Sequence, residues 1–141
     1  MKIVVERYAD SRLHFVAKNE DNIEAHLDAD AQAGGEKKGM KPMELLLSAI
    51  ASCSAMDLYV MLEKQNMPPD AFTITCEGTQ KDNKEIGPFT DIHLEYILHG
   101  EVDEKRAQIA AKLSIEKYCS VAATLSPDVN ITYTVKKVHG R

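Results

Sequence analysis

Two cysteines, Cys53 and Cys119, are the residues of this sequence whose types are best suited to chemistry. A cysteine thiolate is both a nucleophile and a redox group, so the pair predicts a thiol redox site. The sequence shows no export signal, and in a reducing compartment cysteines stay as thiols rather than as structural disulfides. We therefore expect each cysteine to be either a reactive thiol or a buried one, and that distinction decides the function.

Residue types alone leave both interpretations of Cys53 open. The cysteine lies in an apolar stretch that begins at Pro42, and apolar surroundings disfavour a thiolate. Asp57, four residues further along the same helical face, disfavours it more. A helix end contributes only about 0.3 to 1 kcal/mol, which is too little to offset this, so a reactive Cys53 needs a neighbouring cation. The upstream candidates are Arg7, Arg12, Lys38 and Lys41.

Cys119 also has two interpretations. It follows a charged helical end and precedes a short helix, where backbone N–H groups favour a thiolate, but a capping or core cysteine fits equally well. Cys76 alternates in phase with Phe72 and Ile74, which predicts a structural residue facing the core. The five histidines lack metal-ligand spacing, and no Cys-x-x-Cys pair or nucleotide-binding fingerprint occurs. We expect neither a metal site nor a bound cofactor.

Length and composition predict one domain over residues 1–141, with 44% hydrophobic and 28% charged residues, as in globular proteins. The net charge of -5 argues against a nucleic-acid partner, because phosphate backbones are bound by concentrated basic faces. We see no apolar run that approaches the roughly 20 residues of a membrane span, and no signal peptide. These features predict a soluble cytoplasmic protein that does not bind membranes.

Hydrophobic periodicity predicts the order of elements. Apolar and polar residues alternate in three short runs before residue 30, which predicts three strands joined by hairpin turns. A glycine-rich stretch at 33–39 predicts a mobile surface loop, and Pro42 suits the first turn of a helix that runs to about Gln65. Then come strands at 72–76 and 92–98 joined through a turn at 81–84, a helix from Asp103 to Tyr118, a helical turn at 121–125 and a strand at 129–135. This order predicts an α+β fold rather than a parallel βαβ series.

The first half of the long helix is apolar on nearly every side. Leucine, alanine and isoleucine occupy positions 45–47 and 49–51, so the segment has no solvent face. A small domain by itself buries such a helix poorly. We expect the helix to be enclosed by a sheet or by another subunit.

Four segments, residues 39–47, 53–57, 87–92 and 113–121, resemble the OsmC/Ohr family of osmotically inducible and organic hydroperoxide resistance proteins. The likeness spans nearly the whole chain and is greatest to the subgroup with Pro-Met-Glu-Leu-Leu-Leu at 42–47. The resemblance implies an intertwined homodimer, in which antiparallel sheets from both chains wrap around long central helices and two sites lie at the subunit interface.

The resemblance also implies a thiol peroxidase with an antioxidant role in stress responses. In such an enzyme Cys53 attacks an organic hydroperoxide and becomes a sulfenic acid, which Cys119 resolves as a Cys53–Cys119 disulfide. A dithiol such as a lipoyl group is the implied reductant. An apolar pocket that includes Leu46 and Ile50 favours alkyl substrates over hydrogen peroxide.

One position departs from the family pattern. The peroxidases carry a glutamate directly after the proline that opens the helix, where this chain has Met43; Glu44 follows one residue later, about 100° around the helix. Arg12, Lys41 and Glu44 are the candidates for activating the thiol. Two other functions stay open: a noncatalytic stress-response dimer that binds an apolar ligand beside buried cysteines, and a redox protein that reacts with a different electrophile.

Overall fold

A computed structural model describes residues 1–81 and 87–138 of the chain. The chain separates into two compact units, Met1–Leu46 and Leu47–Arg141, here called the N-terminal and C-terminal units. The turn predicted at 81–84 lies mostly outside the described residues, as does His139. The α+β class predicted from the order of elements is confirmed.

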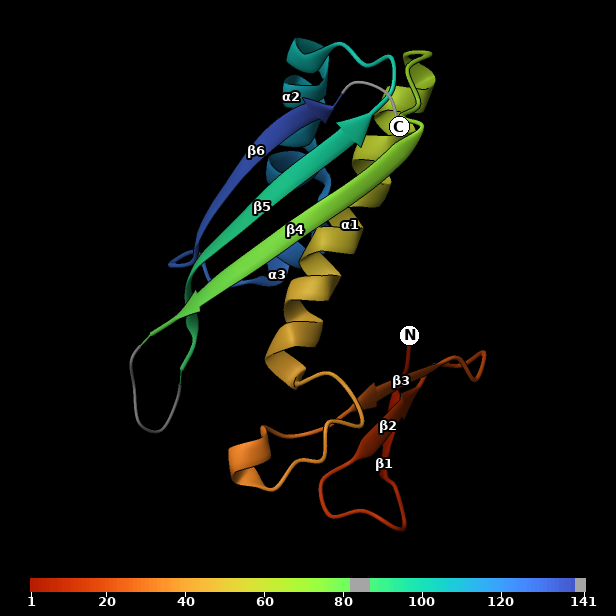
Figure 1. Cartoon of the computed structure of the whole chain (residues 1–141), viewed down its shortest axis with the longest axis vertical. Coiled ribbons are helices and arrows are strands. Elements are labelled where there is room, and N and C mark those ends of the chain that lie inside the picture. The colour runs from red at the N-terminus through yellow and green to blue at the C-terminus, as the bar shows by residue number, and fades with distance from the viewer. Residues whose placement is uncertain (82–86, 139–141) are drawn as a thin grey trace. The chain divides into compact units, whose positions relative to one another are not determined.

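The N-terminal unit is built on a three-stranded antiparallel sheet, in the order β1-β2-β3 (Figure 1). The strands are β1 (Val4–Arg7), β2 (Phe15–Lys18) and β3 (Glu24–Leu27), as the alternation predicts. A 3₁₀ turn, η1 (Ala31–Ala33), follows β3 and is capped by the Asp30 side chain, which accepts from the backbone N–H of Gln32.

The segment after β3 is held by a buried carboxylate, a feature that the glycine-rich composition hides. Asp28 Oδ2 accepts hydrogen bonds from the backbone N–H groups of Glu36 and Lys38, at 3.0 and 3.1 Å. Met40 then forms a parallel bridge with Leu27. The predicted surface position of the loop is confirmed, since residues 33–39 are exposed or half-buried, and its mobility stays a prediction. Asp28 supplies hydrogen bonds that the loop cannot form within itself.

The predicted long helix is α1 (Pro42–Lys64). Pro42 occupies its first turn, and Glu44 Oε1 accepts from the backbone N–H of Lys41 at 2.9 Å, the second half of a capping box. The helix ends before Asn66, which adopts the left-handed conformation with φ of 58°. Its buried residues repeat every four positions: Ile50, Ser54, Leu58 and Leu62.

The expectation that no apolar run approaches a membrane span is wrong for α1. The helix has 23 residues, and an 18-residue window within it reaches a mean hydropathy of 1.8, enough by length and composition to cross a membrane. The same properties suit the core helix of a soluble protein. Only 22% of that window is buried within the chain.

The C-terminal unit carries a second sheet, in the order β4-β5-β6. Strands β4 (Ala71–Gln80) and β5 (Phe89–His99) are antiparallel, whereas β6 (Asn130–Val138) runs parallel to β5. The resemblance implies antiparallel sheets, and the pair β4–β5 is antiparallel, whereas the pair β5–β6 is parallel. The reason is the connection from β5 to β6, which contains α2 (Glu104–Leu113), the π-helical segment η2 (Ser114–Tyr118) and α3 (Ser120–Thr124), and this long crossover returns the chain in the same direction.

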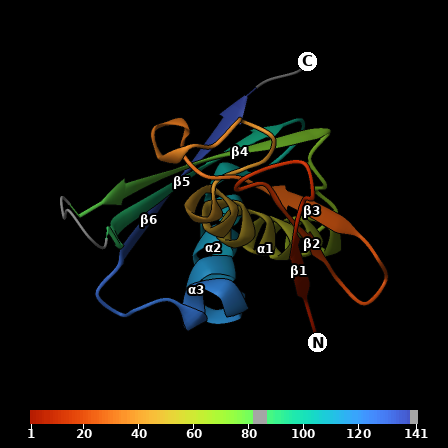
Figure 2. The ribbon, with the colours of Figure 1, turned by 90° about the horizontal axis from the view of Figure 1, so that it is seen from below.

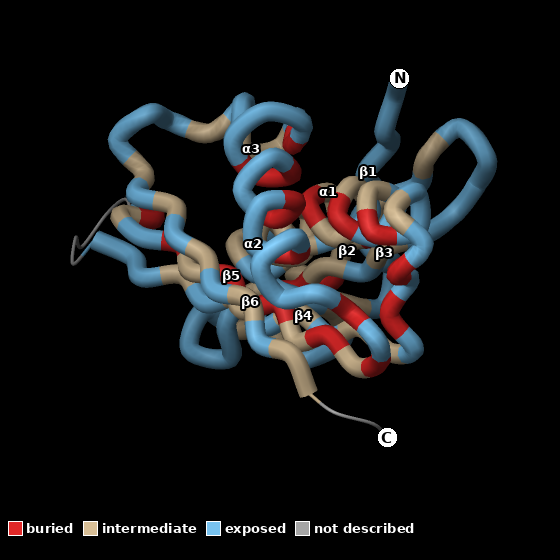
Figure 3. The backbone as a smooth tube through the Cα atoms, turned by 90° about the horizontal axis from the view of Figure 1, so that it is seen from above, coloured by how far each residue is buried: buried red, intermediate tan, exposed pale blue. Residues whose placement is uncertain are grey.

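The core of the C-terminal unit lies between this sheet and its helices. Helices α1, α2 and α3 cover one face of the sheet (Figures 1 and 2), and buried segments gather where α1 and α2 face β5 (Figure 3). Four alternate residues of β5 are completely buried and face the helices: Ile92, Leu94, Tyr96 and Leu98. Tyr96 is polar, so the hydroxyl group that it brings into this core needs a partner.

Candidate functional site

The structure brings the thiol of Cys53 next to that of Cys119, close enough to raise the pKa of Cys119. Cys53 lies on α1 and is half-buried, whereas Cys119 precedes α3 and is 3% exposed. Both are reduced. Two cysteines far apart in the sequence thus form one dithiol inside the C-terminal unit.

The surroundings of Cys119 favour its protonated form. Burial is the main cause that raises the pKa of the Cys119 thiol, and its hydrogen bond to Cys53 and the charge of a Cys53 thiolate raise it further. Backbone N–H groups act in the opposite direction, since Ala122 donates to Cys119 Sγ at 3.3 Å and caps α3. The effect of burial is larger than that of the N–H groups, so the pKa of Cys119 is raised overall. Cys119 therefore keeps its proton and can donate it toward Cys53.

Cys76 lies on β4, where it pairs with Leu94 and is half-buried. Burial raises the pKa of its thiol to about 11. At neutral pH this thiol is almost entirely protonated, which makes it a poor nucleophile.

Tyr96 forms a buried polar network behind the two thiols, which the sequence reasoning missed. Its hydroxyl group donates to Ser54 Oγ at 2.8 Å, and the side chain of Ser114 is also hydrogen-bonded to it. Ser54 follows Cys53 on α1, and Ser114 begins η2. The sequence did contain an indication of this network. Tyr96 occupies an inward-facing position of an alternating strand, where its hydroxyl group needs a partner, and Ser54 follows the candidate nucleophile Cys53.

The candidates for activating the thiol all lie in the N-terminal unit, where each has a local partner. Arg12 Nη1 donates to the carbonyl oxygen of Ala33 at 2.9 Å, and Lys41 Nζ is 3.7 Å from Asp30 Oδ2. The carboxylate of Glu44 caps α1. Activation of Cys53 by any of them stays a prediction.

The pocket residues predicted on α1 differ in burial. Ile50 is completely buried on the face of α1 that also carries Ser54, and Leu46 is half-buried. Within residues 1–81 and 87–138, no group of three or more histidines, cysteines or carboxylates is arranged to hold a metal ion.

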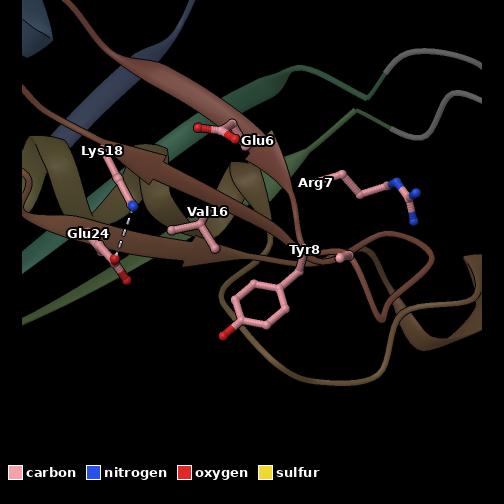
Figure 4. A pocket seen from close by; sticks show the side chains of 7 residues that line it. Glu6, Arg7, Tyr8, Val16, Lys18 and Glu24 are labelled. Atoms are coloured by element: carbon pink, nitrogen blue, oxygen red, sulfur yellow. Dashed lines mark ion pairs between the residues drawn. The ribbon is translucent and has the colours of Figure 1, made fainter.

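The N-terminal unit has two hollows of its own. One, of about 420 Å³, is lined mainly by the apolar side chains of Val5, Leu13, Phe15, Leu27 and Pro42. The other, of about 310 Å³, is polar: Lys18 and Glu24 are paired at 3.6 Å beside Val16, and Arg7 points away from them (Figure 4). Two acidic residues, Glu6 and Glu24, and two basic residues, Arg7 and Lys18, line this polar hollow, so its formal charges balance.

Fold and sequence comparisons define the family. The fold matches a protein from Aquifex aeolicus VF5, at 31% identity and a TM-score of 0.83 over 99% of this chain and 97% of that one. A family model described as OsmC-like protein matches residues 34–134, and the chain belongs to this family. Protein YhfA of Escherichia coli K12 is 39% identical over 106 residues, which cover 72% of this chain and 75% of the relative. An organic hydroperoxide resistance protein OsmC from Legionella pneumophila shares the fold, with a TM-score of 0.71 at 16% identity over 96% of this chain and 97% of that one.

Proposed function

We propose that this chain is a thiol peroxidase that reduces organic hydroperoxides through Cys53 and Cys119. The observation that carries the proposal is the contact between the thiols of Cys53 and Cys119, which raises the pKa of Cys119. It joins α1 to the start of α3 in a family that includes organic hydroperoxide peroxidases. Two thiols in contact are suited to a cycle in which one reacts and the other forms a disulfide with it.

The proposed cycle balances with one peroxide and one dithiol. The Cys53 thiolate attacks the terminal peroxide oxygen, the O–O bond breaks, and the alkoxide leaves as an alcohol after taking up a proton. Cys53 is then a sulfenic acid. Cys119 loses its proton and attacks the Cys53 sulfur, the S–O bond breaks, the leaving hydroxide takes up that proton as water, and the Cys53–Cys119 disulfide forms. A dithiol such as a lipoyl group returns two electrons and two protons and restores both thiols.

The environments of the two thiols support this assignment of roles. Cys119 is almost completely buried, and the raised pKa of its thiol keeps it protonated beside Cys53. Cys53 is half-buried and is thus more open to a substrate. Leu46 and Ile50 are the proposed apolar contacts for an alkyl group, and Arg12 or Lys41 the proposed cation.

We propose that the active form is an intertwined homodimer in the cytoplasm. Within the described part of the N-terminal unit, Val16 is the one buried hydrophobic residue, and it is still 8% exposed. So small a core does not stabilise 46 residues by itself. Exposed apolar side chains of both units are available to a second copy: Ile3, Val4, Val5, Tyr8, Ile23 and Met40, with Met56, Tyr59 and Val60 on α1.

The test is consumption of cumene hydroperoxide, with reduced lipoamide as the electron donor, by the parent protein and three cysteine variants. Cys53→Ser should abolish turnover. Cys119→Ser should react once per site and then accumulate sulfinic or sulfonic acid at Cys53, detected by mass spectrometry. Cys76→Ser is the matched control and should keep the parent rate. Turnover by Cys53→Ser at the parent rate would rule out the proposed cycle.

A second function, an apolar-ligand-binding dimer without catalysis, is favoured by the apolar hollow of the N-terminal unit. Its lining suits an alkyl chain. The same peroxide assay separates the two functions. A binding module consumes no hydroperoxide, and its affinity for an apolar fluorescent probe should fall in Phe15→Ser and stay unchanged in Cys53→Ser. A redox protein for another electrophile would leave hydroperoxide intact but still form the Cys53–Cys119 disulfide with a general thiol oxidant.

A further inference from the structure

One hydroxyl group, that of Tyr96, connects the two segments that carry the redox pair. It donates to Ser54 Oγ at 2.8 Å and is hydrogen-bonded to the side chain of Ser114. Ser54 is the residue after Cys53, and η2, which begins at Ser114, ends immediately before Cys119. The strand β5 therefore holds both thiol-bearing segments through a single side chain.

The three hydroxyl-bearing residues are sealed from solvent. Tyr96, Ser54 and Ser114 are each 0% exposed. Ser54 Oγ also donates to the carbonyl oxygen of Ala51 at 3.1 Å. A buried polar group without a partner is costly, so movement of either serine away from Tyr96 is opposed. The network is a rigid link rather than a surface contact.

The π-helical segment η2 is fastened to the sheet at a second point. Tyr133 on β6 donates through its hydroxyl group to Glu116 Oε2 at 2.8 Å. Because π-helical turns are rare and less stable than α-helix, their persistence depends on such tertiary contacts. Ser114 and Glu116 are thus both anchored, and the chain leaves η2 directly into Cys119, which caps α3.

We propose that Tyr96 is a positioning residue that holds Cys53 and Cys119 at the spacing from which their disulfide forms. This inference rests on the proposed function. A disulfide tolerates only a narrow range of Cα separations and dihedral angles, so the relative position of α1 and the start of α3 controls how readily it forms.

The ionisation of Tyr96 is consistent with this positioning role. Burial raises the pKa of the Tyr96 hydroxyl group, and the charges of Cys119 and Cys76 raise it further, against the lowering effect of the two serine hydrogen bonds. The phenol therefore stays protonated at the pH where a peroxidase works. It remains a hydrogen-bond donor and does not act as a base.

The test measures the Cys53–Cys119 disulfide directly, in the full-length protein. Tyr96→Phe removes the hydroxyl group and keeps the ring, while Leu98→Val, on the same face of β5, is a core control that removes one buried methylene. The equilibrium constant for disulfide formation is measured in glutathione redox buffers. It should fall about fivefold to tenfold in Tyr96→Phe, as expected for the loss of one or two hydrogen bonds, and less than about twofold in Leu98→Val.

Two further readouts make the experiment decisive. Under one equivalent of cumene hydroperoxide, Tyr96→Phe should leave more Cys53 as sulfinic acid than the parent protein, because resolution is slower. Adding Ser54→Ala to Tyr96→Phe should cause little further loss, since both changes remove the same hydrogen bond. A parent protein that forms no disulfide would overturn both proposals. A parent with the disulfide and an unchanged constant in Tyr96→Phe, or an equal loss in Leu98→Val, would overturn the positioning role alone.

Discussion

At the scale of single residues, the three thiols of this chain differ through burial and through what surrounds them. Cys119 is buried next to Cys53. Cys76 is half-buried and lies on β4, an element that carries neither of the other two cysteines. Burial raises the pKa of both Cys119 and Cys76, that of Cys76 to about 11. Chemical reactivity should therefore distinguish the three.

We predict that iodoacetamide modifies Cys76 and Cys119 slowly at pH 8. A thiol with a pKa of about 11 is roughly one thousandth ionised at pH 8, and only the thiolate reacts. The modification rate of Cys76 should rise about tenfold per pH unit up to its pKa. Peptide mass spectrometry of the reduced protein gives the three rates. Modification of Cys76 at pH 8 as fast as that of free cysteine would contradict the prediction.

The missing glutamate at position 43 gives a second prediction at this scale. Glu44 does not replace it, because its carboxylate caps α1 through the Lys41 N–H. Cys53 lies ten residues, or roughly 15 Å, further along the helix, so in the proposed homodimer a group at 43 would act on the thiol of the second chain. We expect Met43→Glu to orient an arginine there and speed reaction of Cys53 with cumene hydroperoxide up to about fivefold, since exposed ion pairs contribute about 1 kcal/mol at most.

The control for position 43 is Met43→Gln, which has a similar shape without the charge. Stopped-flow measurement of Cys53 oxidation compares the three proteins at pH 7. Equal rates in Met43→Glu and Met43→Gln would show that this chain activates its thiol without a carboxylate at the start of α1.

At the scale of elements, the segment between β3 and α1 shows how one side chain orders a glycine-rich stretch. Asp28 is 4% exposed. Burial by itself would raise the pKa of this carboxyl group, but hydrogen bonds from the backbone N–H groups of Glu36, Lys38 and Ala29 bring it below its ordinary value. The charged form is thus the one that the folded segment stabilises.

We predict that this segment loosens in acid and in Asp28→Asn. Because the folded-state pKa of Asp28 is lowered, its stabilising effect is present above the ordinary carboxyl pKa of about 3.9 and is lost as pH falls through the lower folded value. In Asp28→Asn the amides of Glu36 and Lys38 should exchange with deuterium faster at pH 7. Asp10→Asn, at an exposed turn, is the control. Unchanged protection in Asp28→Asn would contradict the anchoring role.

At the scale of the whole molecule, several large apolar side chains are exposed on the chain. Met56 on α1 is 68% exposed, and Tyr59 and Val60 beside it are also exposed. Large exposed apolar patches mark interaction surfaces. The proposed second copy of the chain is the partner that would cover these side chains.

We predict an obligate homodimer whose melting temperature falls on dilution, because dissociation and unfolding are then linked. Val60→Lys should weaken dimerisation by about tenfold or more, the effect of roughly 1.4 kcal/mol, while Glu63→Lys, on an exposed polar position of the same helix, should change it little. Sedimentation over a range of concentrations gives both constants. A folded, stable monomer at low concentration would reject the intertwined dimer.

Local sequence determined the elements of this protein. Alternating residues in β5 and β6, the capping aspartate Asp103 and Pro42 at the start of α1 each act within a few residues, so periodicity and capping were enough to place strands and helices. The same reasoning singled out Cys53 and Cys119 by residue type. Their pairing was implied by resemblance to a family and by no local signal.

Tertiary structure alone decided which elements and side chains meet. The parallel pairing of β6 with β5, the contact between Cys53 and Cys119, and the link through Tyr96 all join residues that are distant in the sequence. Such contacts depend on the path of the whole chain and on the burial that it creates. Burial also sets the pKa of Cys119 and makes the hydroxyl group of Tyr96 require two partners, because an apolar interior penalises charges and unpaired polar groups that water would otherwise solvate.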